Sequence, residues 1–214
     1  TFIDSSWYFL RYLCSDSNEK AFDSKIANKW LPVDLYIGGS EHATMHLLYA
    51  RFITKALRDM NLLDFNEPFK QLYHQGTITK DGAKMSKSKG NTVSPDDFIS
   101  QYGSDVFRCY LMFMGPYDEG GDWNDRGITG IAKFLNKIFT IIEKPDGGNS
   151  ESEIKSIHKT LKSVTEDLDS FKFNTAISRM MEMSNKLISS NTLSNTNKSI
   201  IIKMISPFAP HLGE

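Results

Sequence analysis

The feature that most constrains the fold is a short apolar segment followed by two glycines and a long amphipathic segment. Residues 33–37 form a strand candidate that is preceded by Pro32 and ends at Gly38 and Gly39. Apolar side chains then recur every three or four positions over residues 41–60, which predicts a helix. A strand joined to a helix by paired glycines is typical of a parallel sheet that places a ligand at the helix N-terminus. Many such turns are purely structural, so this unit alone does not establish a ligand site.

Further elements are expected on both sides of this unit. The aromatic N-terminal segment predicts a helix from about Ser5 to Leu13, and residues 70–74 predict a second strand. Ser94 and Pro95 have the order of an N-cap and a first helical residue, and Gly103 is expected to end that helix. Ser104 is expected to cap the next helix, over residues 105–114, and residues 120–123 (GGDW) are expected to form a loop.

The pattern changes at about residue 124. Apolar residues keep helical spacing up to Ile142, and a linker at residues 145–153 is followed by three more amphipathic segments, at about 153–171, 174–190 and 195–206. No internal repeat is visible. We therefore predict an α/β portion over residues 1–122 and an antiparallel, all-α helical bundle over residues 123–214.

A lysine-rich segment lies at residues 79–93 of the α/β portion. Four lysines and one aspartate between Lys80 and Lys89 give a local charge of +3, although the whole chain has a net charge of −1. Gly82, Gly90 and the intervening serines predict a mobile surface loop, and lysines at fixed spacing are suited to a phosphate-bearing ligand. From charge alone, the alternative is an ordinary solvated basic loop. The segment is not a Walker P-loop, because the required order of glycines and lysine is absent.

Residues 38–46 (GGSEHATMH) form a second candidate site. Glu41 at a helix N-terminus is suited to accept hydrogen bonds from a ribose, and paired glycines let a nucleotide approach the backbone. His42 and His46 are four residues apart, which places them on one face of a helix. We predict no metal there, because the pair lacks a general-base glutamate and a third ligand. Histidines that bond only to backbone carbonyls are the structural alternative.

Composition sets wider limits. With 40% hydrophobic and 24% charged residues, the chain has the composition of a globular protein, and its near-neutral charge means that any nucleic-acid contact is local. The two cysteines, Cys14 and Cys109, form neither a zinc motif nor a disulfide framework, so a reducing cytoplasm is expected. No signal peptide or membrane-spanning run is recognised, and we expect no membrane partner.

The order of residues in the lysine segment favours one family. Residues 84–88 read Lys-Met-Ser-Lys-Ser and match the second signature of class I aminoacyl-tRNA synthetases at every position. Residues 38–46 and residues 1–8 (TFIDSSWY) resemble the leucyl-tRNA synthetase family, whereas isoleucyl and valyl enzymes typically have Asp-Gln in place of Glu41-His42. The resemblance covers nearly the whole chain. It implies the second half of a Rossmann-like parallel-sheet catalytic domain with the lysine loop at residues 80–91, followed by the start of the anticodon-binding domain.

The same resemblance implies roles for individual residues. Two lysines are implied to be catalytic, by neutralising the charge that develops on departing pyrophosphate: Lys84 and Lys87. The implied ATP-binding residues are Gly38, Gly39, Glu41, Met85, Ser86 and Ser88. The implied amino-acid-binding residues are Phe2, Ser5, Tyr8, His42 and His46. The spacing of the first three would place them on one face of a helix, as the lining of one pocket requires.

The implied reaction is the ATP-dependent activation of leucine to leucyl-adenylate, followed by transfer to tRNA(Leu). Magnesium would accompany ATP through phosphate and water oxygens, and the complete protein is expected to be a monomer. The family's first signature, a His-x-Gly-His stretch, is absent from the chain, as are the editing insertion and an insertion before the lysine loop. We therefore interpret the chain as part of a longer protein and expect residues 1–214 alone to be inactive.

Two alternatives remain open at this point. Within the class, isoleucine, valine and methionine are the alternative substrates, and the isoleucyl and valyl enzymes are similar over residues 38–46. From a different class of function, the alternative is a non-catalytic tRNA-binding or interaction module.

Overall fold

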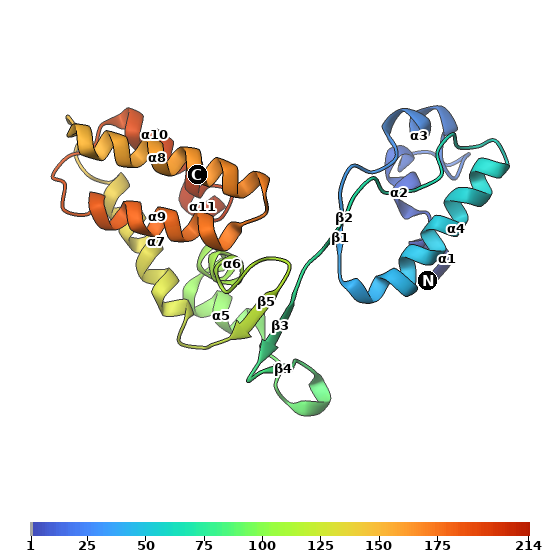
Figure 1. The fold of residues 1–214 in the computed structure, drawn as a ribbon, viewed down its shortest axis with the longest axis horizontal. Helices are drawn as coiled ribbons and strands as arrows, with labels where there is room; N and C mark the ends of the chain where they lie inside the picture. Colours follow the sequence, from blue (N-terminus) through green and yellow to red (C-terminus); the bar gives the residue numbers. More distant parts are fainter. Residues whose placement is uncertain (1) are drawn as a thin grey trace. The chain divides into compact units, whose positions relative to one another are not determined.

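The computed structural model describes residues 2–214 and divides into two compact units, Thr1–Gln75 and Gly76–Glu214 (Figure 1). We describe each unit by itself. Their boundary falls inside the predicted α/β portion, so the strands and helices of residues 76–122 pack within the same unit as the C-terminal helices. The predicted division at residue 122 is a different one, because it separates the catalytic domain from the anticodon-binding domain. It stays a prediction.

The first unit combines a short parallel sheet with helices. Strand β1 (Tyr36–Gly38) pairs with β2 (Leu72–His74), with Tyr36 opposite Leu72, and a single bridge joins Val33 to Phe69. The helices are α1 (Phe2–Ser5), α2 (Tyr8–Arg11), η1 (Tyr12–Cys14), α3 (Ser24–Trp30), η2 (Ser40–Thr44) and α4 (His46–Asp59). The parallel pairing confirms the sheet expected from the strand, paired glycines and helix.

The core of this unit lies where α2, α3 and α4 meet the strand segments. Its buried apolar residues are Phe9, Leu10, Ala27, Leu47, Ala50, Leu63 and Phe69. The buried face of α4 consists of Leu47, Ala50 and Thr54, whereas Phe52 is 67% exposed. Asp23 caps α3 by accepting hydrogen bonds from the backbone N–H groups of Lys25 and Ile26, which fixes where that helix begins.

Two helix predictions in the first unit are wrong in detail. The expected helix from Ser5 to Leu13 is broken between α1 and α2, where the hydroxyls of Ser5 and Ser6 donate to the carbonyl of Phe2. Such local side-chain bonds compete with the helical ladder. The expected helix over residues 41–60 consists of η2 and α4, separated at Met45 (φ −124°, ψ −96°). His42 and His46 therefore do not share one face of a single helix.

An exposed ion-pair cluster ties α4 to the loop that leads to β2. Arg51 donates two hydrogen bonds to Glu67, at 2.7 and 2.9 Å, and the Lys55 ammonium lies 3.0 Å from the same carboxylate. The Arg51 hydrogen bonds, with the Lys55 ammonium, lower the pKa of Glu67 from 4.5 to about 2. Because the pKa of Glu67 is lower in the folded protein than in the unfolded chain, its ionised carboxylate stabilises the fold at pH values above the unfolded pKa. This stabilisation is lost as the pH falls through the folded pKa.

Replacing Glu67 by glutamine is therefore expected to lower the free energy of unfolding of the first unit at pH 7 by about 0.2–1 kcal/mol, the usual range for exposed pairs. The difference from the wild type should disappear as the pH falls from about 4.5 to about 2. Hydrogen exchange of the α4 amides across this pH range measures the effect. Asp64→Asn in the same unit is the control, because Asp64 forms no ion pair within residues 2–214. An unchanged difference at pH 2 would contradict the assignment.

The second unit begins with a three-stranded sheet of order β4–β3–β5. Its strands are β3 (Thr77–Lys80), β4 (Ala83–Lys84) and β5 (Gly120–Trp123). Strand β3 pairs antiparallel with β4 and parallel with β5. The prediction of a loop at residues 120–123 is wrong, because pairing with β3, more than 40 positions away, makes this segment a strand. Gly120 (φ 83°) is required there, since a Cβ would collide with the backbone of Thr77.

Helices form the rest of the second unit (Figure 1). They are η3 (Lys87–Lys89), α5 (Pro95–Tyr102), α6 (Ser104–Phe113), α7 (Ile128–Ile142), α8 (Glu151–Asp169), α9 (Phe173–Leu187), α10 (Asn195–Ile205) and α11 (Pro210–Gly213). The predicted start of α5 is confirmed, with Ser94 at the N-cap, Pro95 in the first turn and Gly103 (φ 86°) at the end. The three predicted C-terminal helices also occur, with ends shifted by at most three residues.

One extended core unites these helices with the sheet. Its fully buried side chains include Ile128, Ile138, Ile157, Ile177, Leu187 and Phe208. Trp123 of β5 is buried against the rings of Phe98 and Tyr110, at centroid distances of 4.8 and 5.0 Å. This packing anchors the sheet, and with it the lysine loop, to the helices. Within residues 2–214, no helix is both long and apolar enough to cross a membrane.

Candidate functional site

The first unit contains a cavity of about 390 Å³ that is lined by all five predicted amino-acid-binding residues. They are Phe2, Ser5, Tyr8, His42 and His46, and the remaining lining residues are Tyr36 and Met45. The residues come from α1, α2, β1, η2 and α4, so tertiary packing and not one helix face brings them together. Apart from Ser5, the wall is formed by aromatic rings, imidazoles and a thioether, which suits a small apolar ligand that carries a few polar groups.

A chain of hydrogen bonds crosses the wall of this cavity. The hydroxyl of Tyr8 lies 2.5 Å from that of Tyr36, and the Tyr36 hydroxyl lies 2.6 Å from Nε2 of His46. Burial, together with the Tyr8 hydrogen bond, raises the pKa of Tyr36, so the phenol stays protonated at neutral pH. The sequence reasoning missed Tyr36. Its position two residues before Gly38, close to the end of the strand candidate, was the available signal, because strand ends at a sheet edge commonly contribute to ligand sites.

His46 has a distinct electrostatic environment. Burial, and then the neighbouring His42, lowers its pKa, so the imidazole is neutral at neutral pH. The two imidazole rings stand edge to face with centroids 6.0 Å apart. Nδ1 of His46 is buried and has no hydrogen-bond partner within residues 2–214. The cavity wall therefore contains a neutral imidazole that is oriented by Tyr36 through Nε2, and its buried Nδ1 has no hydrogen-bond partner within residues 2–214.

A second cavity, of about 260 Å³, shares Tyr36, His42 and His46 with the first. Gly38 and Gly39 line it, together with His74 of β2, whose Nδ1 lies 3.0 Å from the carbonyl of Gly38. No heavy atom lies within 4 Å of the place where a Cβ of Gly38 would stand. At Gly39, a Cβ would collide with the carboxylate of Glu41, so this acid folds back over the glycine backbone. Gly38 thus leaves the backbone open beside the cavity, whereas the carboxylate of Glu41 occupies the space beside Gly39.

In the second unit, the lysine loop is carried by a tight β-hairpin. Strands β3 and β4 are joined by Asp81 (φ 54°) and Gly82 (φ 69°), and Lys80 pairs with Ala83. Two successive residues with positive φ are typical of the type I′ turn that Asp-Gly favours. The sequence predicted a mobile surface loop over this segment, and the structure shows that it begins with a hairpin, for which the Asp-Gly pair was the signal. Asp122 of β5 clamps the turn by accepting hydrogen bonds from Thr79 Oγ1 (2.6 Å) and Gly82 N (3.0 Å).

The loop beyond the hairpin is closed by one amide side chain. Asn91 accepts a hydrogen bond from the backbone N–H of Ser86 (2.9 Å) and donates one to the carbonyl of Lys84 (3.3 Å). Ser86 caps η3 by accepting from the backbone N–H of Lys89, and the hydroxyls of Ser86 and Ser88 lie 3.2 Å apart. Gly90 (φ 66°) ends this helix in the left-handed conformation. The sequence reasoning gave Asn91 no role, although it forms the base of the loop.

The side chains of the loop divide into two groups. Lys84, Lys87 and Ser88 are exposed, whereas Met85 is half-buried and packs against the core of the second unit. Met85 therefore anchors the loop while the lysine ammonium groups face solvent. Within residues 2–214, no group of three or more His, Cys, Asp and Glu side chains is arranged to hold a metal ion. Each unit thus contains one candidate site: an aromatic cavity with glycine backbone beside it in the first unit, and a buttressed cationic loop in the second.

Two family models match the chain, one over its N-terminal part and one over its C-terminal part. Residues 6–124 match the model of class I tRNA synthetases (I, L, M and V), and residues 154–214 match the anticodon-binding domain of tRNA ligase. The catalytic-domain match contains β1, the paired glycines, the lysine loop and β5. Tyr36, His42 and His46 of the cavity also lie within it.

Individual relatives agree with these matches. The chain is 50% identical to leucine–tRNA ligase of Caldanaerobacter subterraneus and 52% identical to that of Clostridium kluyveri, in each case over 100% of this chain and 29% of the relative. The chain therefore spans less than a third of the length of these relatives. A structure of Agrobacterium radiobacter LeuRS in ternary complex with tRNA and LeuAMS is similar with a TM-score of 0.85 and 36% identity, over 100% of this chain and 30% of that one.

More distant structures share the fold alone. Mycobacterium tuberculosis methionyl-tRNA synthetase, in complex with methionyl-adenylate, aligns with a TM-score of 0.70 at 18% identity, over 98% of this chain and 47% of that one. The parallel strands, the Lys-Met-Ser-Lys-Ser loop and a family match over more than half of the residues agree with one another. The chain belongs to the class I tRNA synthetases of the I, L, M and V group and contains part of their catalytic domain and of their anticodon-binding domain.

Proposed function

We propose that this chain is part of a leucyl-tRNA synthetase, which activates leucine with ATP and transfers it to tRNA(Leu). The observation that carries the proposal is the single cavity lined by Phe2, Ser5, Tyr8, His42 and His46. About 50% identity to leucine–tRNA ligases along the full chain supports leucine over the other amino acids of the group.

In this proposal the 390 Å³ cavity holds the leucine side chain. Phe2, Tyr8 and Met45 offer apolar contacts to an isobutyl group, and the neutral imidazole of His46 allows an uncharged wall. A single methylene changes binding by only about 1–3 kcal/mol, so the shape of this wall has to carry much of the discrimination. The hydrogen bonds from Tyr8 through Tyr36 to His46 keep the wall rigid, which favours selection by shape.

The ATP site is proposed to have two parts. Gly38 and Gly39, which line the second cavity, are proposed to let the nucleotide approach the backbone, and Glu41 is the proposed acceptor of hydrogen bonds from the ribose. The lysine loop meets the phosphates, with Lys84 and Lys87 as the catalytic cations and Ser86, Ser88 and the backbone at Met85 as further donors. Mg²⁺ arrives with ATP and is bound through phosphate and water oxygens.

The chemistry needs no covalent enzyme intermediate. A leucine carboxylate oxygen attacks the α-phosphorus of ATP, the bond to the bridging oxygen breaks, and pyrophosphate leaves with the electron pair. The developing negative charge on pyrophosphate is the charge that fixed cations stabilise best. In the second step, a terminal ribose hydroxyl of tRNA(Leu) attacks the leucyl carbonyl and AMP leaves. Positioning and electrostatics therefore account for the rate.

Further parts of the proposal concern the whole protein. We infer that helices α7 to α10 begin an antiparallel anticodon-binding bundle, with the family domains dividing at residue 122. The complete protein is proposed to act as a cytoplasmic monomer. Residues 1–214 alone are expected to form no adenylate, because part of the nucleotide site is proposed to lie outside them.

Leucine-dependent exchange of pyrophosphate into ATP tests the proposal. The complete protein should catalyse exchange with leucine at least about 100-fold more efficiently than with isoleucine, valine or methionine, a ratio within reach of a shaped apolar pocket. Preference for another of these amino acids would reassign the substrate. Absence of exchange with all four would favour a non-catalytic tRNA-binding module, and robust exchange by residues 1–214 alone would contradict the expected inactivity.

A further inference from the structure

The turn that joins α8 to α9 places a phenylalanine in the left-handed backbone conformation (Figure 1). Phe171 has φ 57°, its N–H donates to the carbonyl of Leu168 (3.1 Å), and the N–H of Lys172 donates to that of Asp167 (2.8 Å). These two bonds form the Schellman motif, whose left-handed position is usually a glycine and sometimes an asparagine. A bulky side chain is disfavoured there, because its Cβ crowds the backbone.

Other helix ends of the chain use the residue types that this conformation favours. Asn61 (φ 59°) ends α4 with the same pair of backbone bonds, and Gly90 and Gly103, both with positive φ, end η3 and α5. Within residues 2–214, the non-glycine residues with positive φ are Asn61, Asp81 and Phe171. Asparagine and aspartate tolerate the conformation, whereas a bulky residue keeps it only where the surrounding structure holds it. The contacts of the Phe171 ring therefore require an explanation.

The ring of Phe171 belongs to a cluster of three aromatic side chains. It stacks on Tyr117 with ring centroids 6.3 Å apart and meets Phe173 edge to face at 5.8 Å. Tyr117 and Phe173 also meet edge to face, at 5.4 Å. Phe173 in turn lies 6.4 Å from the buried ring of Phe208 in the core of the second unit. Tyr117 lies in the loop between α6 and β5, so the cluster joins that loop to the helices.

Backbone contacts continue from Tyr117 to the strand that leads into the lysine loop. The carbonyl of Tyr117 accepts a hydrogen bond from the N–H of Gly76 (2.8 Å), the residue directly before β3. A Cβ at Gly76 would collide with the backbone of Glu119 and Gly120, so the loop before β5 packs closely against the start of β3. Strand β3 pairs with β5 and continues through the hairpin to Lys84. The position of Tyr117 thus bears on the position of the lysine loop.

We propose that Phe171 is a positioning residue for the lysine loop. Its ring, packed against Tyr117 and Phe173, fixes the loop before β5 and with it the start of β3. Asp122 holds the opposite end of β3, at the hairpin turn, so the two contacts fix the strand at both ends. The expected effect on the reaction rate rests on the proposed function, because only that function assigns the lysines to ATP.

The test is hydrogen exchange in the complete protein carrying Phe171→Gly. Glycine suits the left-handed conformation, so the turn should persist while the ring is lost. The amides of residues 76–84 should exchange about three- to tenfold faster, the change that loss of aromatic pairs produces. The amides of α8 and α10 should exchange no faster than in the wild type. Tyr117→Ala should give the same result, and the double variant should add little, because both changes break one contact.

Two further variants are controls. Phe171→Tyr keeps the ring and should match the wild type. Phe139→Ala removes a phenylalanine that is 55% exposed on α7, and it should leave the protection of residues 76–84 unchanged. Leucine-dependent pyrophosphate exchange should fall about three- to tenfold in Phe171→Gly, less than the ~100-fold cost of displacing a catalytic group by about 1 Å. The ATP concentration for half-maximal rate should rise, whereas that for leucine should stay constant.

Three results would overturn the role of Phe171. Unchanged protection of residues 76–84 in Phe171→Gly would show that the ring does not hold β3. Equal acceleration throughout the second unit would show a general loss of stability. Faster hydrogen exchange with unchanged pyrophosphate kinetics would show that the contact does not position the lysines. If the wild type itself exchanged no pyrophosphate with any of the four amino acids, the proposed function would fail, and the protection of residues 76–84 would still decide whether Phe171 holds the strand.

Discussion

Replacing Lys87 by alanine in the complete protein is expected to lower the maximal rate of leucine-dependent pyrophosphate exchange by about 100- to 1,000-fold. Losses of this size follow removal of one preorganised group that stabilises developing charge. The leucine concentration for half-maximal rate should change by less than about twofold, since an interaction made mainly in the transition state contributes little to ground-state binding. Exchange rates at varied leucine and ATP concentrations measure both quantities.

Lys89→Ala is the matched control for this prediction. Lys89 lies in the same short helix, η3, and is exposed like Lys87, but its side chain is not assigned a catalytic role. Its replacement removes the same charge from the loop and is expected to lower the rate by less than about tenfold, as general electrostatics would. If leucine affinity collapsed in the Lys87 variant while turnover survived, the assigned role of Lys87 would be wrong. Equal losses in both variants would mean that the loop acts only through its total charge.

Replacing Asp122 by alanine is expected to lower the exchange rate by about 10- to 100-fold, although its side chain is not assigned to touch any substrate. Asp122 accepts the hydrogen bonds from Thr79 and Gly82 that hold the hairpin carrying Lys84. Misplacing a catalytic group by about 1 Å can cost about 100-fold in rate. The ATP concentration for half-maximal rate should rise, whereas the leucine concentration for half-maximal rate should stay constant. Hydrogen exchange of residues 79–93 should accelerate, which a general loss of stability would not confine to this segment.

Three variants separate this positioning role from simple loss of charge. Asp122→Asn keeps an acceptor oxygen and should lose less activity than Asp122→Ala, and Thr79→Val should reproduce part of the loss. Asp118→Ala, at an exposed position shortly before β5, should be neutral. The Thr79 hydroxyl and the Gly82 N–H lower the pKa of Asp122, so its carboxylate is ionised at neutral pH. The difference between Asp122→Ala and the wild type should therefore persist at neutral pH and disappear only in acid, below the ordinary pKa of 3.8. Normal exchange rates in Asp122→Ala would contradict the role.

Local sequence signals account for most of the helices. Ser94-Pro95 marks the start of α5, and apolar periodicity marks α7, α9 and α10. The start of α8 was placed slightly late, because the Ser150–Glu153 capping box that the structure contains was not recognised. The hairpin at Asp81-Gly82 could also be predicted locally, because Asp-Gly favours a two-residue type I′ turn. These errors concern signals that lie within four residues of the position they determine.

The errors that no local rule could avoid involve distant partners. Strand β5 exists because Gly120–Trp123 pairs with Thr77–Lys80, and its glycine-rich composition alone is typical of a loop. The kink at Met45 likewise accompanies contacts of His46 with Tyr36 and Tyr8. Helical periodicity describes a single segment, so it contains no information about these contacts.

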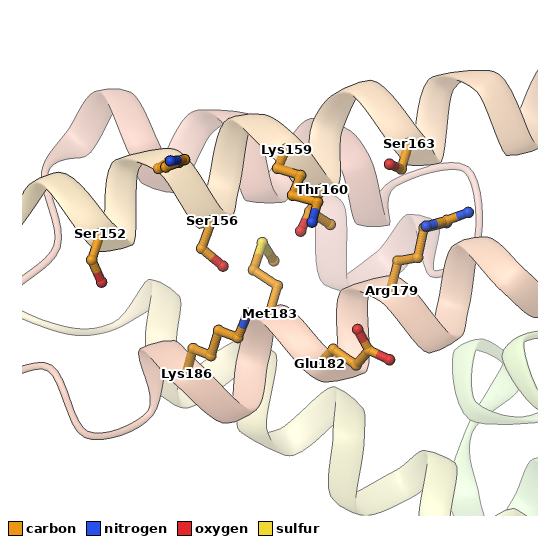
Figure 2. Close-up of a pocket in the computed structure, with 10 residues that line it drawn as sticks. Ser152, Ser156, Lys159, Thr160, Ser163, Arg179, Glu182, Met183 and Lys186 are labelled. Carbon is orange, nitrogen blue, oxygen red and sulfur yellow. The ribbon is translucent and has the colours of Figure 1, made fainter.

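The sequence by itself determined the chemistry of the site: the two lysines within Lys-Met-Ser-Lys-Ser, the paired glycines, and five side chains suited to line a pocket. Only the tertiary structure decided how these groups are held, through the hydrogen bonds of Tyr36, Asn91 and Asp122. The same holds for a polar hollow of about 430 Å³ that side chains of α8 and α9 line together (Figure 2). The physical reason is that residue type fixes charge and hydrogen-bonding capacity, whereas the partner of each group depends on segments brought together by burial of the two cores.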